Sequence, residues 1–173
     1  LIEAALQAAG YAAVNRRRPF AFERLEGFQT KVWQELRRDS QSRRAAPDKP
    51  FLFGFDKDPA VIEMAKTNAR AAGVEKWISF SVCNVESLTA PAGLESGMIV
   101  TNPPYGERLE DTEIAKVLMG AFSKTLKTHF KGWNCWILNG NPEAITGLRL
   151  KAKLKVPIWN AQIDCRFLNY PIT

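Results

Sequence analysis

Short apolar runs alternate along the chain with longer segments in which apolar residues recur every three or four positions. Four of the runs have the pattern of strands buried on both faces of a parallel sheet, and they lie at 51–55, 77–82, 98–101 and 133–138. The longer segments have the spacing of helices, at 1–10, 60–73 and 111–129. This alternation predicts βαβ units and a mostly parallel sheet covered on both faces. Two closing runs, at 148–156 and 162–170, predict a C-terminal antiparallel hairpin.

Local signals set the ends and the buried faces of the helices. Asp58 and Pro59 predict the start of the helix at 60–73, because aspartate caps a first turn and proline suits its first position. Gly73 predicts its end. The residues expected to face the core are Val61, Ala65, Ala69 and Ala72 here, and Ile114, Val117, Leu118, Ala121, Phe122 and Leu126 in the helix at 111–129.

Composition excludes several classes of protein. The chain has 173 residues, 46% of them hydrophobic, which is enough for one domain with a core. Its longest apolar runs are far too short to span a membrane. Three widely spaced cysteines argue against a zinc site and a disulfide framework, so we expect no metal and a reducing, cytoplasmic setting. The single histidine, His129, is expected to be a solvated residue of a helix end.

Positive charge is concentrated in a basic segment at 11–50. The chain carries a net charge of +6, and this segment holds ten Lys or Arg residues against five acids. A polyanion such as RNA is the natural partner of such a segment, and Arg16, Arg17 and Arg18 are its densest cluster. The alternative is an ordinary amphipathic helix at 30–44, with Val32, Trp33 and Leu36 turned inward.

Polar residues follow the predicted strands, where ligands bind in parallel α/β sheets. Asp56 is placed to accept from the two hydroxyls of a ribose, although it can also serve as a helix-entry residue. The Asn84 side chain can accept from an adenine amino group while the Val85 amide donates to the ring, or Asn84 can simply form a turn. Asn139 and Asn141 follow a later strand.

The sharpest signal is N-P-P-Y at 102–105, directly after the strand at 98–101. Pro103 restricts Asn102 to an extended conformation, and both prolines lack an N–H. The result is a rigid ledge that offers only acceptors, the Asn102 side-chain oxygen and the Pro103 carbonyl. Two such acceptors can hold the N–H groups of an exocyclic amine and direct its lone pair at an electrophile. Tyr105 then offers a flat face for a planar base.

These residues resemble a known family. The stretches FGFDKDPAVIEMAKTNARAAGV, NVESL, TNPPYGERL and NAQIDCRFLNY are similar to S-adenosylmethionine-dependent N2-guanine methyltransferases of bacterial large-subunit (23S) ribosomal RNA, the L-type module of the K/L family. The resemblance implies a Rossmann-like class I methyltransferase domain over 1–173, incomplete at its N-terminus, and an upstream RNA-binding THUMP domain. It implies Asn102, Pro103 and Tyr105 as catalytic residues, with Pro104 also against the substrate, and Asp56 as the ribose-binding acid. At position 84 such enzymes often have Asp.

The chain departs from the family pattern at its start. In the family a strand and a glycine-rich loop precede the segment LIEAA, and both are absent from this sequence. We expect that strand to be the centre of the sheet, and we expect these 173 residues alone to bind cofactor weakly. Glu3 is placed to contact the cofactor or to be an exposed helix acid.

Other interpretations stay open. N-P-P-Y also serves enzymes that methylate adenine N6 or a release-factor glutamine, and the chain could be an RNA-binding scaffold without activity. Four cations alternate with apolar residues near the C-terminus, so they would share one face of the strand at 148–156. They could contact RNA phosphates or protect a sheet edge from aggregation, and they are Arg149, Lys151, Lys153 and Lys155.

Overall fold

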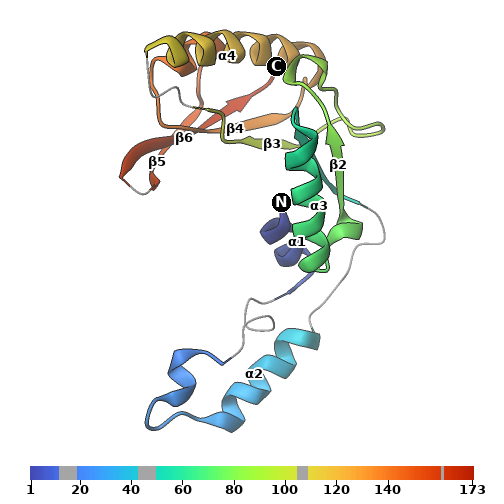
Figure 1. Cartoon of the computed structure of the whole chain (residues 1–173), viewed down its shortest axis with the longest axis vertical. Coiled ribbons are helices and arrows are strands. Elements are labelled where there is room, and N and C mark those ends of the chain that lie inside the picture. Colours follow the sequence, from blue (N-terminus) through green and yellow to red (C-terminus); the bar gives the residue numbers. More distant parts are fainter. Residues whose placement is uncertain (12–18, 43–49, 105–108, 161) are drawn as a thin grey trace. The chain divides into compact units, whose positions relative to one another are not determined.

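The computed structural model describes residues 1–11, 19–42, 50–104, 109–160 and 162–173 (Figure 1). The chain divides into two compact units, residues 1–82 and 83–173. Each unit is an α/β arrangement of its own, with its own sheet and its own core. In the described part of the chain, no helix is long and apolar enough to cross a membrane.

The first unit contains a two-stranded parallel sheet. Strand β1 pairs with β2, with Leu52 opposite Ile78 and Asp56 opposite Val82. Its elements are α1 (Ile2–Ala8), β1 (Leu52–Asp56), α3 (Pro59–Ala71), the 3-10 turn η3 (Glu75–Trp77) and β2 (Ile78–Val82). The predicted strands at 51–55 and 77–82 and the helices at 1–10 and 60–73 are therefore confirmed within one or two residues.

Local chemistry explains the ends of α3. The Asp58 side chain accepts a hydrogen bond of 2.8 Å from the Ala60 amide, and Pro59 occupies the first helical position, as predicted. Gly73 then ends the helix with a φ of 66°, a left-handed conformation that favours glycine. The prediction for one face residue is wrong: Val61 is 37% exposed and Ile62 is buried in its place. The adjacent residues lie about 100° apart around a helix, so the apolar pattern alone does not separate them.

A small aromatic cluster organises residues 19–42. It joins the 3-10 turn η2 (Ala21–Arg24) to α2 (Thr30–Ser42), with ring centroids of Phe22 and Trp33 5.0 Å apart and of Phe20 and Trp33 5.8 Å apart. Trp33 is half-buried, as expected, but Val32 and Leu36 are 46% and 57% exposed. The inward orientation predicted for Val32 and Leu36 is therefore wrong, and it is Trp33 that packs against the rings of Phe20 and Phe22.

The second unit contains a four-stranded sheet in the order β3-β4-β6-β5. Strands β3 and β4 are parallel, whereas β4 with β6 and β6 with β5 are antiparallel, so the predicted C-terminal hairpin is confirmed. The elements are η4 (Val85–Ser87), β3 (Met98–Thr101), α4 (Leu109–His129), β4 (Asn134–Asn139), η5 (Ala144–Leu148), β5 (Leu154–Asn160) and β6 (Ile163–Pro171). The missing central strand stays a prediction.

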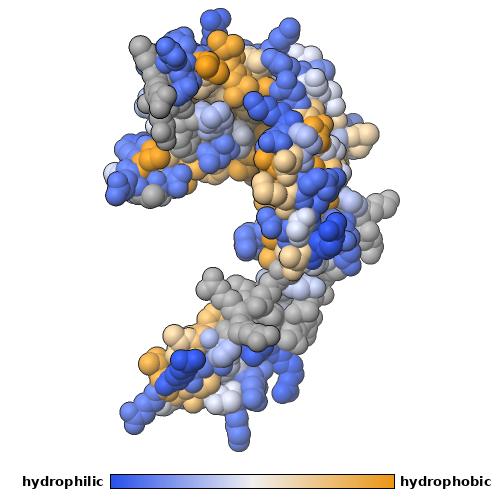
Figure 2. Space-filling model, viewed as in Figure 1, coloured by the Kyte–Doolittle hydropathy of each residue, from blue (hydrophilic) through white to orange (hydrophobic). Residues whose placement is uncertain are grey.

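Helix α4 packs on η5 and contributes to a large core. The buried residues of this core include Met119, Phe122, Leu126, Ile137 and Tyr170. The predicted face of α4 is correct for Phe122 and Leu126 but wrong for Ile114 and Val117, which are 69% and 72% exposed. Thr112, Ala115 and Ser123 are buried instead. Hydrophobic residues accordingly reach the surface over α4 (Figure 2).

The first strand of the predicted C-terminal hairpin, expected at 148–156, begins later than predicted. Strand β5 starts at Leu154, not at 148, because residues 144–148 form η5 and Arg149 then adopts a left-handed φ of 50°. The strict alternation of Arg149, Lys151 and Lys153 is therefore not that of a strand, and their predicted common face is wrong. Lys155 does lie in β5, an edge strand of the sheet.

Candidate functional site

Asp56 ends β1 and turns the chain into α3. Its Oδ1 accepts a hydrogen bond of 2.9 Å from the Asp58 amide, and Asp58 in turn caps the helix. Asp56 is half-buried and its helix-entry role is thus observed. One carboxylate oxygen has this structural use, and a carboxylate can accept several hydrogen bonds, so the side chain retains capacity for a ribose hydroxyl.

Asn84 lies at the start of the second unit and caps η4. Its Oδ1 accepts from the Val85 amide at 3.0 Å, and its Nδ2 donates to Glu86 Oε2 at 3.3 Å. Asn84 therefore has the turn-forming role. Its hydrogen bond engages the Asn84 side-chain oxygen with the Val85 amide, the two groups that an adenine would need. The Val85 carbonyl is also held, since Thr125 Oγ1 of α4 donates to it at 2.9 Å. This bond fixes η4 on the helix.

Asn102, Pro103 and Pro104 leave β3 directly, after Thr101 pairs with Ile137 of β4. This pairing of β3 with β4 fixes the point at which Asn102 leaves the sheet. Asn102 and Pro104 are exposed and Pro103 is half-buried. An accessible stretch thus follows the strand, and its rigidity and acceptor role stay predictions. Asp56 belongs to the first unit, whereas Asn84, Val85 and Asn102 belong to the second.

Four predicted site residues lie outside the described residues: Tyr105 and the three arginines Arg16, Arg17 and Arg18. Glu3 is described; it is exposed in the first turn of α1, and that helix has no side-chain cap. Its cofactor role stays a prediction.

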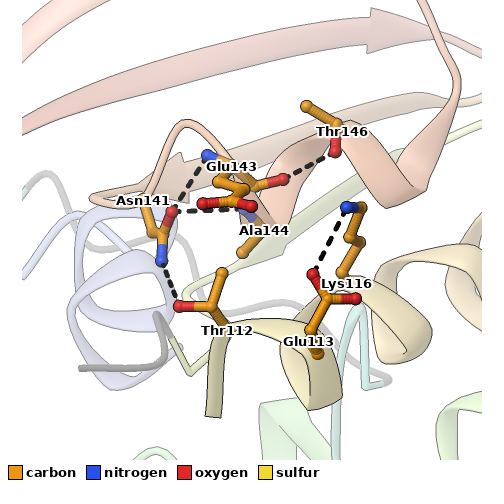
Figure 3. Close-up of polar contacts among 7 residues, drawn as sticks. All are labelled: Thr112, Glu113, Lys116, Asn141, Glu143, Ala144 and Thr146. Atoms are coloured by element: carbon orange, nitrogen blue, oxygen red, sulfur yellow. Dashed lines mark hydrogen bonds and ion pairs between the residues drawn. The ribbon is translucent and has the colours of Figure 1, made fainter. Parts of the chain in front are cut away.

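A polar network missed by the sequence analysis braces the start of α4. Asn141 Oδ1 accepts from the amides of Glu143 at 2.9 Å and Ala144 at 3.2 Å, while Asn141 Nδ2 donates to Thr112 Oγ1 at 3.2 Å (Figure 3). Thr112 is only 6% exposed. Asparagine before Pro142 and Glu143 is a recognisable turn signal, but its partner lies 29 residues away. Asn141 is therefore a structural residue that holds the β4–η5 connection against the first turn of α4.

Buried titratable groups in the second unit belong to its core. Burial raises the pKa of the Cys135 thiol to about 12, and burial together with the charge of Cys135 raises the pKa of Tyr170 to about 12. Both groups therefore stay protonated at neutral pH. Cys135 and Cys165 are fully buried, and His129 is exposed at the end of α4, as predicted.

Comparison with solved structures defines the class of protein. A possible methylase from Clostridium difficile 630 superposes with a TM-score of 0.88 over 99% of this chain and 45% of its own, at 29% identity. SMU.472, solved in complex with SAH, gives the same TM-score at 24% identity. A predicted N6-adenine-specific DNA methylase from Listeria monocytogenes gives 0.83 at 28% identity, over 99% of this chain and 43% of its own. The fold is that of an α/β methyltransferase of the class I type.

A sequence match assigns the chain to one family within this class of methyltransferases. Residues 1–169 match the family described as RMKL-like, methyltransferase domain, and the chain belongs to it. The ribosomal RNA large subunit methyltransferase K/L of Vibrio campbellii is 40% identical over 99% of the chain, and that of Aliivibrio fischeri is 38% identical over all of it. The chain spans about a quarter of the length of these curated relatives, 25% in each case. The resemblance recognised in the sequence is confirmed, and S-adenosylmethionine is the cofactor of this class.

Proposed function

We propose that the chain is the catalytic domain of an RNA methyltransferase that transfers a methyl group from S-adenosylmethionine to the N2 amine of a guanine in 23S ribosomal RNA. The observation that carries the proposal is the accessible stretch Asn102–Pro104 that follows β3 in a member of the RMKL-like family. Relatives up to 40% identical over this chain bear the name of a ribosomal RNA methyltransferase, which favours this substrate.

The ledge acts through position and electrostatics. Asn102 Oδ1 and the Pro103 carbonyl accept from the two N–H groups of the guanine amine, which helps that nitrogen to pyramidalise and frees its lone pair. The bound cofactor supplies an electrophilic methyl group on a sulfonium. Methyl transfer would form the N–C bond while the S–C bond breaks, and the surplus N–H proton would then leave to water. No strongly basic side chain is required, because the amine loses its proton after it has become a cation.

Residues from both units would hold the cofactor, and Asp56 would hold its ribose. Asp56 would accept from the ribose hydroxyls through the carboxylate capacity that its bond to the Asp58 amide leaves. Asn84 and Val85 would contact adenine only after the Asn84 oxygen leaves the Val85 amide. Glu3 is an additional candidate for the cofactor, and the expected glycine-rich loop would hold its methionine end.

Substrate contacts extend beyond the ledge. Pro104 and Tyr105 would hold the flat base, and Arg16, Arg17 and Arg18 would bind RNA phosphates together with an upstream THUMP domain. Three free cysteines suit the reducing cytoplasm, where ribosomal RNA is modified.

Methylation of adenine N6 is the second candidate. The Listeria monocytogenes structure, described as a predicted N6-adenine-specific DNA methylase, is 28% identical and has a TM-score of 0.83. The two acceptors of the ledge would hold an adenine amine equally well. The basic segment at 11–50 is compatible with either nucleic acid.

Methylation of defined 23S RNA fragments by the full-length protein, with the product mapped by mass spectrometry, tests the proposal. Asn102→Ala should lower kcat by about 100- to 1,000-fold, as removal of one oriented polar group does in other enzymes, while cofactor affinity changes little. Asn134→Ala is the matched control, because Asn134 is an exposed asparagine at the start of the neighbouring strand β4. A product methylated at adenine N6, or parallel loss of turnover and cofactor binding in Asn102→Ala, would overturn it.

A further inference from the structure

The second unit holds a cavity of about 520 Å³ that is open to solvent and is lined by residues of η5, of the segment after it and of strands β5 and β6. Its apolar wall includes Leu150, Leu168 and Tyr170, and three cations line it, namely Arg149, Lys151 and Lys155. No acidic residue is among the lining residues. A cavity of this size accommodates a nucleotide, since small-molecule sites in proteins typically measure about 300–1,000 Å³.

Three separate features of the chain bring the cations together. Arg149 follows η5 directly and has a left-handed conformation with φ 50°. Lys151 lies in the connection before β5. Lys155 lies in β5 opposite Leu168, and Leu168 is itself opposite Ile137, so Lys155 emerges on the face of the sheet that carries the buried core.

Within the described part of the chain, the cations of the cavity have no ion pair, unlike four other exposed cations of the fold. Lys66, Arg70, Lys116 and Arg166 each pair with a neighbouring carboxylate. Among the residues that the structure describes, no carboxylate lies within ion-pair distance of Arg149, Lys151 or Lys155. Three uncompensated positive charges around one concave surface repel one another, and a ligand with several negative charges removes that cost.

Lys153 lies between these residues in sequence but does not line the cavity. Its amide donates to the Asn169 carbonyl at 2.8 Å, which fixes the start of the hairpin. Three of the four cations therefore line the cavity, although a simple alternation would place all four on one face of a strand. Edge protection applies only to Lys155, the one of the four cations that lies in β5, and it leaves the place of Arg149 and Lys151 in the cavity unexplained.

We propose that this cavity binds phosphate groups of the RNA backbone, at a second binding point separate from the Asn102 ledge. The inference rests on the proposed function, because it takes RNA as the substrate. The cations would bind adjacent phosphates, and the apolar wall would pack against the sugar or base between them. Phosphate contacts of this kind fix the register of the RNA on the protein without reading its sequence.

Salt-dependent RNA binding by the full-length protein tests the proposal. The triple variant Arg149→Ala/Lys151→Ala/Lys155→Ala should bind a 23S RNA fragment at least tenfold more weakly at low salt. Its plot of log affinity against log salt should flatten by about 0.7 for each single-strand phosphate that the protein no longer neutralises. The matched control is Lys124→Ala/Lys127→Ala/Lys131→Ala, which removes the same charge from exposed positions in and just after α4. At single-residue level, Lys155→Ala should weaken binding more than Lys153→Ala.

Lysine footprinting gives a readout that does not depend on variants. In the wild-type protein, bound RNA should protect Lys151 and Lys155 from acetylation more than Lys153, as measured by mass spectrometry. Protection by RNA and not by free AMP would assign the cavity to the RNA backbone, whereas protection by AMP alone would overturn that assignment.

The outcomes separate this inference from the proposed function. If the wild-type protein methylates guanine N2 but the two triple variants bind RNA equally, the cavity proposal is wrong and the function stands. If the wild-type protein neither binds nor methylates RNA, both are wrong. If it binds RNA through the cavity but methylates no guanine, only the proposed reaction is overturned.

Discussion

The two units are stabilised by cores of different kinds. In the first unit, small residues surround a single large one: Trp77 is 1% exposed, and four of the seven other buried residues of its cluster are alanines. In the second unit, the buried cluster contains several large side chains, including Phe122, Phe130, Trp133, Ile137 and Tyr170. Buried apolar area contributes about 25 cal/mol per Å², so the second core supplies much more stabilisation.

The difference follows from how closely the elements approach. Alanines at Ala5, Ala9 and Ala69 let helices lie near one another and near the sheet, and a Cβ on Gly54 would come within 2.7 Å of Leu1 and Phe80. Close approach leaves little room for large side chains. The first unit therefore depends on one tryptophan, whereas the strand that presents Asn102 belongs to a unit whose core is shared among many residues.

Trp77→Ala should have the largest effect on stability. Loss of a buried tryptophan side chain costs about 3–5 kcal/mol, and this cluster has few other large side chains to fill the space. Hydrogen exchange should show reduced protection of β1 and β2, with β4 and β6 largely unchanged. Trp159→Ala is the control, because Trp159 is 71% exposed. Equal loss of protection in β4 would show that the two cores do not differ in this way.

Alkaline pH should lower the stability of the second unit. Burial raises the pKa of Cys135 from 9.0 to about 12, and the pKa of Tyr170 from 10.0 to about 12. Between these values the unfolded chain has released the proton while the folded chain retains it, so stability present below pH 9 is lost as pH rises toward 12. The free energy of unfolding should fall by about 1.4 kcal/mol per pH unit for each group.

Chemical denaturation at a series of pH values measures this loss. Cys135→Ala should remove the thiol's share of the pH dependence and leave the part due to Tyr170. A pH dependence unchanged by Cys135→Ala would contradict the assignment, as would a greater alkaline loss of protection in β1 and β2 than in β4 and β6.

Asp58→Ala should have the smallest effect, confined to the first unit. It removes the bond to the Ala60 amide at the start of α3, and loss of an N-cap costs about 1 kcal/mol. Asp58→Asn keeps an acceptor oxygen and should change stability by much less. Thermal unfolding of both variants measures the difference; equal destabilisation would mean that the charge, not the cap, stabilises the helix.

Local patterns predict much of this fold. The apolar run at 98–101 forms β3 with the same bounds, and Asp58, Pro59 and Gly73 mark the ends of α3 because capping and left-handed turns depend on nearby residues. The faces of α4 are harder to predict. Ile114 and Val117 are exposed while Thr112 is buried, since burial depends on what packs against the helix and Thr112 has a partner in Asn141.

The candidate site also has residues that the sequence could identify and residues whose role only the structure shows. Asn102 and its prolines are recognisable in the sequence because their chemistry lies in adjacent residues, and the motif needs no distant partner. Asn84 offers two roles in the sequence, and only the structure shows its oxygen on the Val85 amide.

The sequence by itself determined the succession of strands and helices along the chain, the ends of α3, the position of Asn102, Pro103 and Pro104 directly after β3, and the family of the chain. These features depend on the spacing of apolar residues and on the chemistry of residues that are adjacent in the sequence. Only the tertiary structure decided which apolar faces are buried, that Asn141 braces α4, and that Arg149, Lys151 and Lys155 line one cavity without Lys153. Such features arise where segments distant in sequence meet, because burial and charge compensation depend on the neighbours that folding supplies.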